Sequence, residues 1–255
     1  MFDPGHFRLD GQTALVTGAG AGIGRGIAET FAGAGAAVVV SDLQRETADA
    51  VATAITEAGG RAVGIACNVT READLEAAVR TAVDRFGGLT ILVNNAGGGG
   101  PKPFDMPMAD FRWAYEINVF APFRLTQLAV PHMERAGGGA VLNISSMSAE
   151  NKNQRMASYG SSKAAVSHLT RNIAFDLGPK GIRVNAIAPG AIRTDALAKV
   201  LTPDVEAAML KHTPLKRLGE PADIAHAALF LCAPAAAWVS GQILTVSGGG
   251  VQELD

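Results

Sequence analysis

Short apolar runs alternate along the chain with longer amphipathic stretches. The apolar runs are nearly continuous, which is the pattern of strands buried on both faces of a parallel sheet. They predict strands over residues 13–17, 37–41, 62–67, 91–94, 140–144, 183–188 and 242–246. The amphipathic stretches predict helices over residues 24–34, 45–58, 72–86, 108–135, 157–177 and 221–232.

The order of these elements predicts the fold class. Strand–helix–strand repetition implies right-handed crossovers and therefore an α/β protein with a doubly wound parallel sheet. No linker divides the chain, so residues 1–255 are expected to form a single domain. Residues 190–219 interrupt the alternation and contain Pro203 and Pro214. We predict that this segment forms a small helical lid over a substrate site.

Composition excludes several kinds of partner. Of 255 residues, 48% are hydrophobic and 18% charged, and the formal net charge is −2, so we expect a compact enzyme that does not bind nucleic acid. No apolar stretch approaches about 20 residues and residues 1–10 lack a signal-peptide core, so we expect a cytoplasmic protein without a membrane partner. Cys67 and Cys232 are expected to be reduced, and the five histidines show no metal-ligand spacing.

A glycine-rich turn at residues 18–24 follows the first predicted strand and opens the first helix. Such glycines let the backbone approach a pyrophosphate at a helix N-terminus, although the turn alone could also be a tight strand–helix connection. Asp42 ends the second strand, where a carboxylate can bind an adenosine ribose and would repel a 2′-phosphate. Neighbouring Ala21 and Leu43 carry no positive charge, so we expect NAD as cofactor, although Arg45 leaves some room for NADP.

Tyr159 and Lys163 are four residues apart in the predicted helix 157–177 and therefore share one helix face. An ammonium beside a phenol favours the phenolate, so we expect the pKa of Tyr159 to fall below its usual value of about 10. A tyrosine of this kind can act as an acid or a base. Ser146, from a separate segment, could hold a carbonyl or hydroxyl oxygen beside it. A Tyr-x3-Lys pair alone is common, and it gains weight here from the glycine-rich turn.

Together these motifs resemble the short-chain dehydrogenase/reductase family over nearly the whole chain. The matching motifs are Thr17-Gly18-x3-Gly22-x-Gly24, Asn94-Asn95-Ala96-Gly97, Asn118, Ser146, Tyr159-x3-Lys163 and Pro189-Gly190-x3-Thr194. The resemblance implies a single-domain Rossmann fold with a seven-stranded sheet, assembled as a homotetramer. One departure is Asn68-Val69, where the family usually has Asp-Val beside the adenine. Because an amide can still pair with adenine, we expect NAD binding to be retained with altered strength.

The resemblance also implies a role for each matching residue. Tyr159 is expected to be the general acid/base, and Lys163 to lower its pKa and bind the nicotinamide ribose. Ser146 would orient the substrate oxygen, and Asn118, in a helix break, would hold a water that links Lys163 to solvent. The expected NAD-binding residues are Gly18, Gly22, Ile23, Gly24, Asp42, Asn68, Val69, Asn95, Ala96, Gly97, Tyr159, Lys163, Pro189, Gly190, Ile192 and Thr194.

Three segments that usually vary within the family restrict the range of expected substrates. Residues 97–108, 149–153 and 241–254 closely resemble those of bacterial family members that act with NAD on the 7α-hydroxyl group of bile acids, and such loops usually differ between specificities. We therefore expect reversible oxidation of a 7α-hydroxyl to a 7-ketone on a bile acid or another steroid. The expected substrate contacts are Ser146, Glu150, Asn151 and Tyr159, of which Glu150 and Asn151 could also merely cap a turn.

Other functions stay open. A 3-oxoacyl-thioester reductase would normally use NADP, against which Asp42 and Ala21 argue. Another secondary-alcohol or sugar dehydrogenase of the family also agrees with the motifs. A non-catalytic NAD-binding protein is the alternative from a different class. Such a protein could lose Ser146, Tyr159 or Lys163, and all three are present.

Overall fold

The computed structural model describes residues 3–151, 154–199 and 201–250. Its centre is a seven-stranded parallel sheet in the order β3-β2-β1-β4-β5-β6-β7. The strands are β1 (Thr13–Thr17), β2 (Ala37–Asp42), β3 (Arg61–Ala66), β4 (Ile91–Asn94), β5 (Gly139–Ile144), β6 (Ile182–Pro189) and β7 (Ile243–Val246). The seven predicted strands are confirmed to within one residue at each end.

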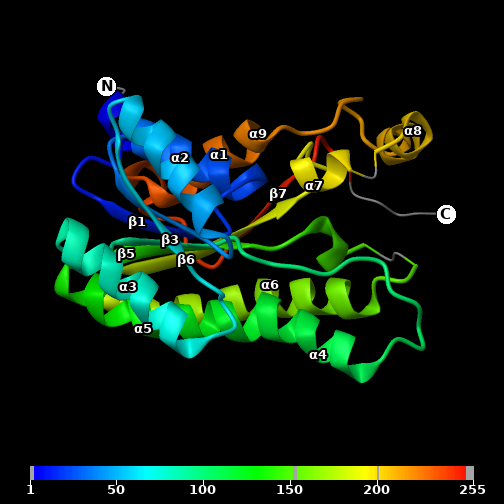
Figure 1. The fold of residues 1–255 in the computed structure, drawn as a ribbon, viewed down its shortest axis with the longest axis horizontal. Coiled ribbons are helices and arrows are strands. Elements are labelled where there is room, and N and C mark those ends of the chain that lie inside the picture. The colour runs from blue at the N-terminus through cyan, green and yellow to red at the C-terminus, as the bar shows by residue number, and fades with distance from the viewer. Residues whose placement is uncertain (1–2, 152–153, 200, 251–255) are drawn as a thin grey trace.

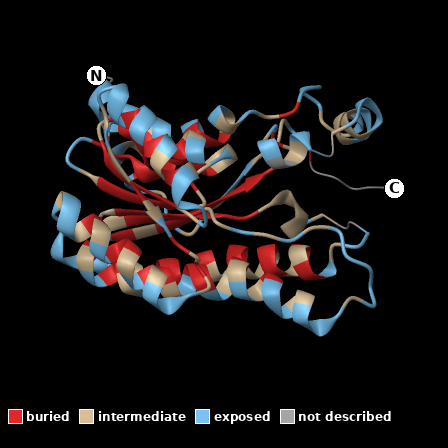
Figure 2. Ribbon diagram, in the orientation of Figure 1, coloured by how far each residue is buried: buried red, intermediate tan, exposed pale blue. Residues whose placement is uncertain are grey.

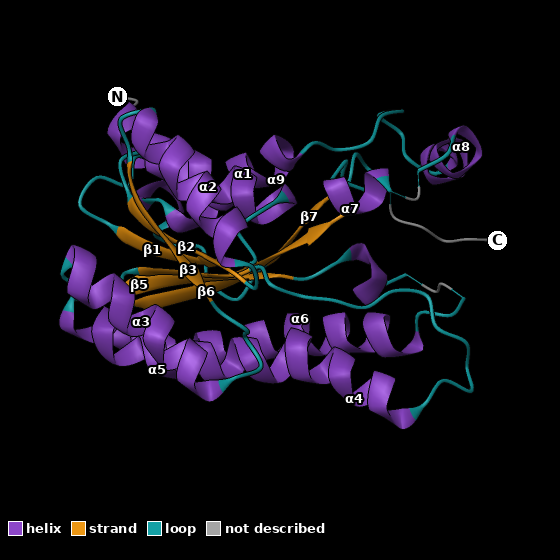
Figure 3. Cartoon of the chain, in the orientation of Figure 1, coloured by secondary structure: helices purple, strands orange, loops and turns teal. Residues whose placement is uncertain are grey.

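Helices cover both faces of this sheet (Figures 1 and 3). One layer contains α1 (Gly22–Gly33), α2 (Arg45–Glu57) and α9 (Pro221–Cys232). The other contains α3 (Glu72–Phe86), α4 (Met108–Tyr115), α5 (Ala121–Arg135) and α6 (Ala157–Leu177). The strand order reverses between β1 and β4, so the predicted single-domain, doubly wound Rossmann fold is confirmed. In such sheets, ligands bind at the carboxyl ends of the strands, next to this reversal.

Burial on both faces explains why the strands are continuously apolar. Every residue of β1 is buried, as is every residue of β4. Adjacent residues point to opposite sides, so that Val16 packs beneath α1 and α9 while Leu15 packs beneath α3 and α5. Figure 2 shows the buried residues concentrated along the sheet and on the helix surfaces that face it.

The predicted helix over residues 108–135 is only partly correct. A five-residue π-helix, η2 (Glu116–Phe120), separates α4 from α5. Such widened turns occur mostly as single turns inside α-helices and often mark functional sites. Here the π-helix carries Asn118, the residue for which a helix break was expected.

The segment predicted as a lid contains α7 (Asp195–Ala198) and α8 (Pro203–Lys211). Its two ends meet in a parallel bridge between Ile192 and Gly219. The Arg193 N–H donates to the Gly219 carbonyl at 2.7 Å, and the Gly219 N–H donates to the carbonyl of residue 191 at 3.0 Å. The segment therefore leaves and rejoins the body at one place. Val200 lies outside the described residues.

Candidate active site

A cavity of about 290 Å³ opens at the carboxyl edge of the sheet; we call it the cleft. It brings together residues from the first turn of α1, the segments at the ends of β4, β5 and β6, and the first turns of α6. The predicted site residues that line the cleft are Ile23, Asn95, Gly97, Ser146, Tyr159, Lys163, Pro189, Gly190, Ile192 and Thr194.

The glycine-rich turn is braced by the asparagine motif after β4. Gly18 and Gly22 adopt positive φ angles of 61° and 53°, which favour glycine. The Asn95 Nδ2 donates to the carbonyls of Thr17 and Gly18, both at 2.9 Å. A side chain at Gly24 would collide with the Gly18 carbonyl and the Asn95 amide. The turn thus exposes main chain at the N-terminus of α1, as pyrophosphate binding requires.

Asp42 lies directly against this turn. Its carboxylate accepts hydrogen bonds from the N–H of Gly20 at 2.9 Å and from the Thr47 hydroxyl at 3.3 Å. A Cβ at Gly20 would lie 2.8 Å from the Asp42 carboxyl carbon, so only glycine permits this approach. Arg45, which had left room for NADP, is paired along α2 with Asp49 at 2.7 Å. These residues fit a nucleotide whose ribose carries free hydroxyls.

Asn68 and Val69 lie beyond the cleft, in the loop that follows β3, just after the Cys67 N–H donates to the Asp42 carbonyl at 2.7 Å. The Asn68 Oδ1 accepts from the N–H and the hydroxyl of Thr70, at 3.0 and 2.8 Å. A main-chain N–H can only donate, so this contact fixes the oxygen end of the amide toward the turn. The contact of Asn68 with the adenine stays a prediction, and the amide NH₂ group is the end that points away from Thr70.

Ser146, Tyr159 and Lys163 meet in the cleft from two elements. Ser146 follows β5, accepts a hydrogen bond from the N–H of Ser148 at 3.1 Å, and lies close enough to Tyr159 to lower the pKa of its hydroxyl. The Lys163 ammonium lies 5.8 Å from the centre of the Tyr159 ring. It donates to the carbonyl of Ile144 at 2.8 Å, and Lys163 is only 5% exposed.

The expected fall in the pKa of Tyr159 is wrong for the protein without cofactor. Burial raises the pKa of Tyr159 and outweighs the opposing hydrogen bond from Ser146. Burial also lowers the pKa of Lys163 to about 8, so its positive charge is itself disfavoured here. The helix spacing places the two groups on one face, but desolvation of the phenolate determines the sign of the shift.

The side chain of Asn118 is buried and fully engaged with protein. It donates to the Gly98 carbonyl at 2.8 Å and to the Ser162 hydroxyl at 3.0 Å, and accepts from the Gly98 N–H at 3.1 Å. A Cβ at Gly97 would lie 2.8 Å from the Asn118 Oδ1 and 3.1 Å from the Lys163 Nζ. The water expected at Asn118 stays a prediction. Because the side chain is already bonded to protein, such a water would have to bind the main chain of Asn118.

Two predicted substrate contacts do not line the cleft. Glu150 and Asn151 follow the short 3₁₀ helix η3 (Met147–Ala149), and both donate their N–H groups to the Met147 carbonyl at 3.0 Å. Their contact with substrate stays a prediction, and residues 152–153 lie outside the described part of the chain.

Sequence reasoning missed four lining residues: Gly98, Gly99, Ile144 and Ser145. Gly99 has a φ of 120°, and a Cβ there would lie 2.9 Å from the Tyr159 ring. The run of glycines at residues 97–100 could have indicated these lining residues, because glycines often mark a close approach of the backbone to another group. The sequence signal for Ser145 was weaker: Ser145 is the immediate neighbour of Ser146.

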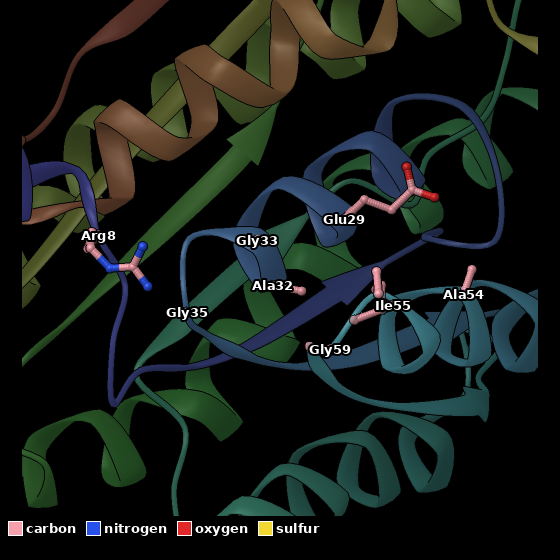
Figure 4. A pocket seen from close by; sticks show the side chains of 10 residues that line it. Arg8, Glu29, Ala32, Gly33, Gly35, Ala54, Ile55 and Gly59 are labelled. Carbon is pink, nitrogen blue, oxygen red and sulfur yellow. The ribbon is translucent and has the colours of Figure 1, made fainter.

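A second hollow, of about 460 Å³, lies at the opposite edge of the sheet, where α1 and α2 end (Figure 4). Its two charged residues have partners outside it: Arg8 pairs with Asp10, and Glu29 with Arg25. The other lining residues are alanine, isoleucine and glycine. None of the predicted site residues lines it. Among residues 3–151, 154–199 and 201–250, no cluster of His, Cys, Asp or Glu could hold a metal ion.

The fold and the cleft define a nucleotide-dependent oxidoreductase domain. Residues 18–250 match the family model described as enoyl-(acyl carrier protein) reductase. The chain is 64% identical over 255 residues to the 7α-hydroxysteroid dehydrogenase of Escherichia coli (strain K12), covering 100% of both chains. It is 40% identical over 240 residues to the cis-4-hydroxycyclohexanecarboxylate dehydrogenase of Sinomonas cyclohexanicum, covering 93% of this chain and 96% of the relative.

Solved structures agree with these relatives. A 7α-hydroxysteroid dehydrogenase complexed with NADH and 7-oxo glycochenodeoxycholic acid superposes with a TM-score of 0.97, at 64% identity and 100% coverage of both chains. A short-chain dehydrogenase/reductase from Mycobacterium marinum gives a TM-score of 0.90 at 35% identity, covering 95% of this chain and 96% of the other. The chain belongs to the short-chain dehydrogenase/reductase family.

Proposed function

We propose that this protein is an NAD-dependent dehydrogenase that interconverts a 7α-hydroxyl and a 7-ketone on bile acids. One observation carries the proposal: Ser146, Tyr159 and Lys163 converge beside a glycine-lined nucleotide cradle. They do so in a chain that is 64% identical, over its full length, to a 7α-hydroxysteroid dehydrogenase. The similar structure with NADH and a 7-oxo bile acid supports both the cofactor and the substrate class.

The chemistry follows from the side chains in the cleft. During oxidation Tyr159 takes the proton of the 7α-hydroxyl, while the Ser146 hydroxyl holds the same oxygen. NAD supplies the hydride acceptor for the hydrogen that leaves C7. Because burial opposes the phenolate, Tyr159 depends on the Lys163 ammonium for this step. In the reverse direction Tyr159 returns its proton to the 7-ketone oxygen.

A paired substrate assay tests the activity. Cholate, which carries a 7α-hydroxyl, is expected to give NADH with NAD as co-substrate, and deoxycholate, which lacks that hydroxyl, is expected to give none. The absorbance of NADH measures both reactions. Turnover of both bile acids would show that the enzyme oxidises a hydroxyl group other than the 7α-hydroxyl. No turnover with either would remove the steroid proposal and direct the search to acyl thioesters and other secondary alcohols.

We propose that Asp42 selects NAD over NADP. Asp42→Asn keeps the shape of the side chain but removes the charge, and is expected to lower the NAD-to-NADP ratio of kcat/KM by about 10-fold or more. Steady-state kinetics with both cofactors measures the ratio. Glu57→Gln, which removes a charge at the exposed far end of α2, is the matched control and should leave it unchanged. An unaltered ratio in Asp42→Asn would contradict the role.

We propose a cytoplasmic homotetramer. Large apolar side chains are exposed at several positions, among them Phe120 and Phe123 next to and on α5, Phe175 on α6 and Trp238 before β7. Exposed apolar patches of this kind mark association surfaces, and two different two-fold contacts generate a symmetric tetramer. Light scattering tests this, and a monomeric mass would contradict it. Within the described ranges, no helix has the length and apolarity needed to cross a membrane.

A further inference from the structure

Ser145, between Ile144 and Ser146, has a hydroxyl that points into α6. The residue is 2% exposed, and its Oγ lies 3.0 Å from the main-chain oxygen of Lys163 and 2.6 Å from the Ser167 Oγ. A carbonyl can only accept, so Ser145 donates to Lys163. The proton between the two hydroxyls must then come from Ser167. Both buried hydroxyls are thereby satisfied, as buried polar groups usually are.

Three consecutive residues at the end of β5 each contact α6. The Ile144 carbonyl accepts from the Lys163 ammonium at 2.8 Å, the Ser145 hydroxyl donates to the Lys163 carbonyl, and Ser146 faces Tyr159 across the cleft. Lys163 is therefore held at both its ammonium and its main chain. Sliding or rotation of α6 against β5 would break several of these bonds at once.

We propose that Ser145 is a positioning residue: by holding the main chain of Lys163, it sets where the Lys163 ammonium and the Tyr159 hydroxyl stand relative to Ser146. This inference rests on the proposed function, since it assigns a partner to the same acid/base pair. Catalytic geometry tolerates little error, because misplacement by about 1 Å can cost about 100-fold in rate.

The alanine variant is expected to fold. In Ser145→Ala the Ser167 hydroxyl loses its acceptor but can turn to the Lys163 carbonyl, four residues earlier in its own helix. No buried hydroxyl is then left unpaired, and only the link between strand and helix is lost. Ser167→Ala is the matched control, because it also removes one buried hydroxyl but keeps the bond from Ser145 to Lys163.

Titration of tyrosinate by ultraviolet absorbance measures the ionisation of Tyr159, which depends on its distance from the Lys163 ammonium. This measurement needs no steroid. The chain has two tyrosines, Tyr115 and Tyr159, so a Tyr159→Phe variant supplies the signal of Tyr115 for subtraction. With NAD bound, Ser145→Ala is expected to raise the titration midpoint of Tyr159 by about half a pH unit or more, because the ammonium is held less closely. Ser167→Ala is expected to match the wild type.

Kinetics supply a second reading with the same three proteins. Ser145→Ala is expected to lower kcat about 10-fold, with KM within about twofold of the wild type, whereas Ser167→Ala stays within twofold in both. An unchanged Tyr159 midpoint in Ser145→Ala, or an equal shift in Ser167→Ala, would overturn the positioning role. Absence of cholate oxidation by the wild type would overturn only the proposed substrate, since the titration is independent of it.

Discussion

Replacing Tyr159 with phenylalanine is expected to lower turnover at least about 1000-fold while NADH binding stays within a few-fold of the wild type. The phenol is the proposed acid/base, and groups in that role contribute roughly 100- to 10,000-fold to rate. Phenylalanine keeps the ring that packs under Gly99, so the backbone around the cleft should keep its shape. Steady-state kinetics and fluorescence titration with NADH measure the two effects separately.

The second tyrosine provides the control. Tyr115 stacks on Phe111, with ring centres 5.3 Å apart, and does not line the cleft. Tyr115→Phe removes the same hydroxyl from a different place and is expected to retain turnover within about twofold. If Tyr159→Phe kept a tenth of wild-type turnover, another group would have to carry the proton. If it lost NADH binding as well, the result would indicate damage to the site rather than loss of an acid/base.

The seven strands could be predicted because parallel strands buried on both faces leave an apolar signature in the local sequence, whereas their order in the sheet was first seen in the structure. The break in the helix at residues 116–120 has no comparable signature in periodicity. It arises where the Asn118 amide reaches across to Gly98 and Ser162, two contacts distant in sequence. The family resemblance predicted this break, whereas the amphipathic pattern alone predicted a continuous helix.

In the site, too, some features could be predicted from local sequence and others depend on contacts between distant residues. The motifs identified most residues of the cleft, since each motif ends a strand or begins a helix at one edge of the sheet. The pKa of Tyr159 could not be obtained from spacing, because the result depends on how far burial outweighs a nearby ammonium. The role of Ser145 was equally hidden, since nothing local shows that a serine after a strand will donate to a helix carbonyl.

Substituting Lys163 with methionine is expected to stabilise the cofactor-free protein at neutral pH, although it should abolish activity. Lys163 is 5% exposed, and burial lowers its pKa to about 8. Burying an ammonium costs more than its bonds return unless a counter-charge is present, so an apolar residue of similar length often stabilises. Loss of the bond to the Ile144 carbonyl offsets part of the gain, by about 1 kcal/mol.

The pH dependence gives this prediction its sign. Between pH 8 and the unfolded-state pKa of about 10.4, the unfolded chain keeps a proton on Lys163 that the folded protein has lost. Wild-type stability therefore rises with pH through this window, by about 1.4 kcal/mol per unit. The methionine variant has nothing to titrate there, so its advantage should be constant below pH 8 and shrink by about 3 kcal/mol towards pH 10.4.

Urea unfolding of both proteins from pH 7 to pH 10 measures this difference. Ser146→Ala, which alters the same cleft without removing a charge, is the control and should differ from the wild type by a constant amount over this range. A difference between wild type and Lys163→Met that stays flat would mean that Lys163 keeps its charge throughout. In that case the bond to Ile144 would outweigh burial, and Tyr159 would face a full positive charge even without the cofactor.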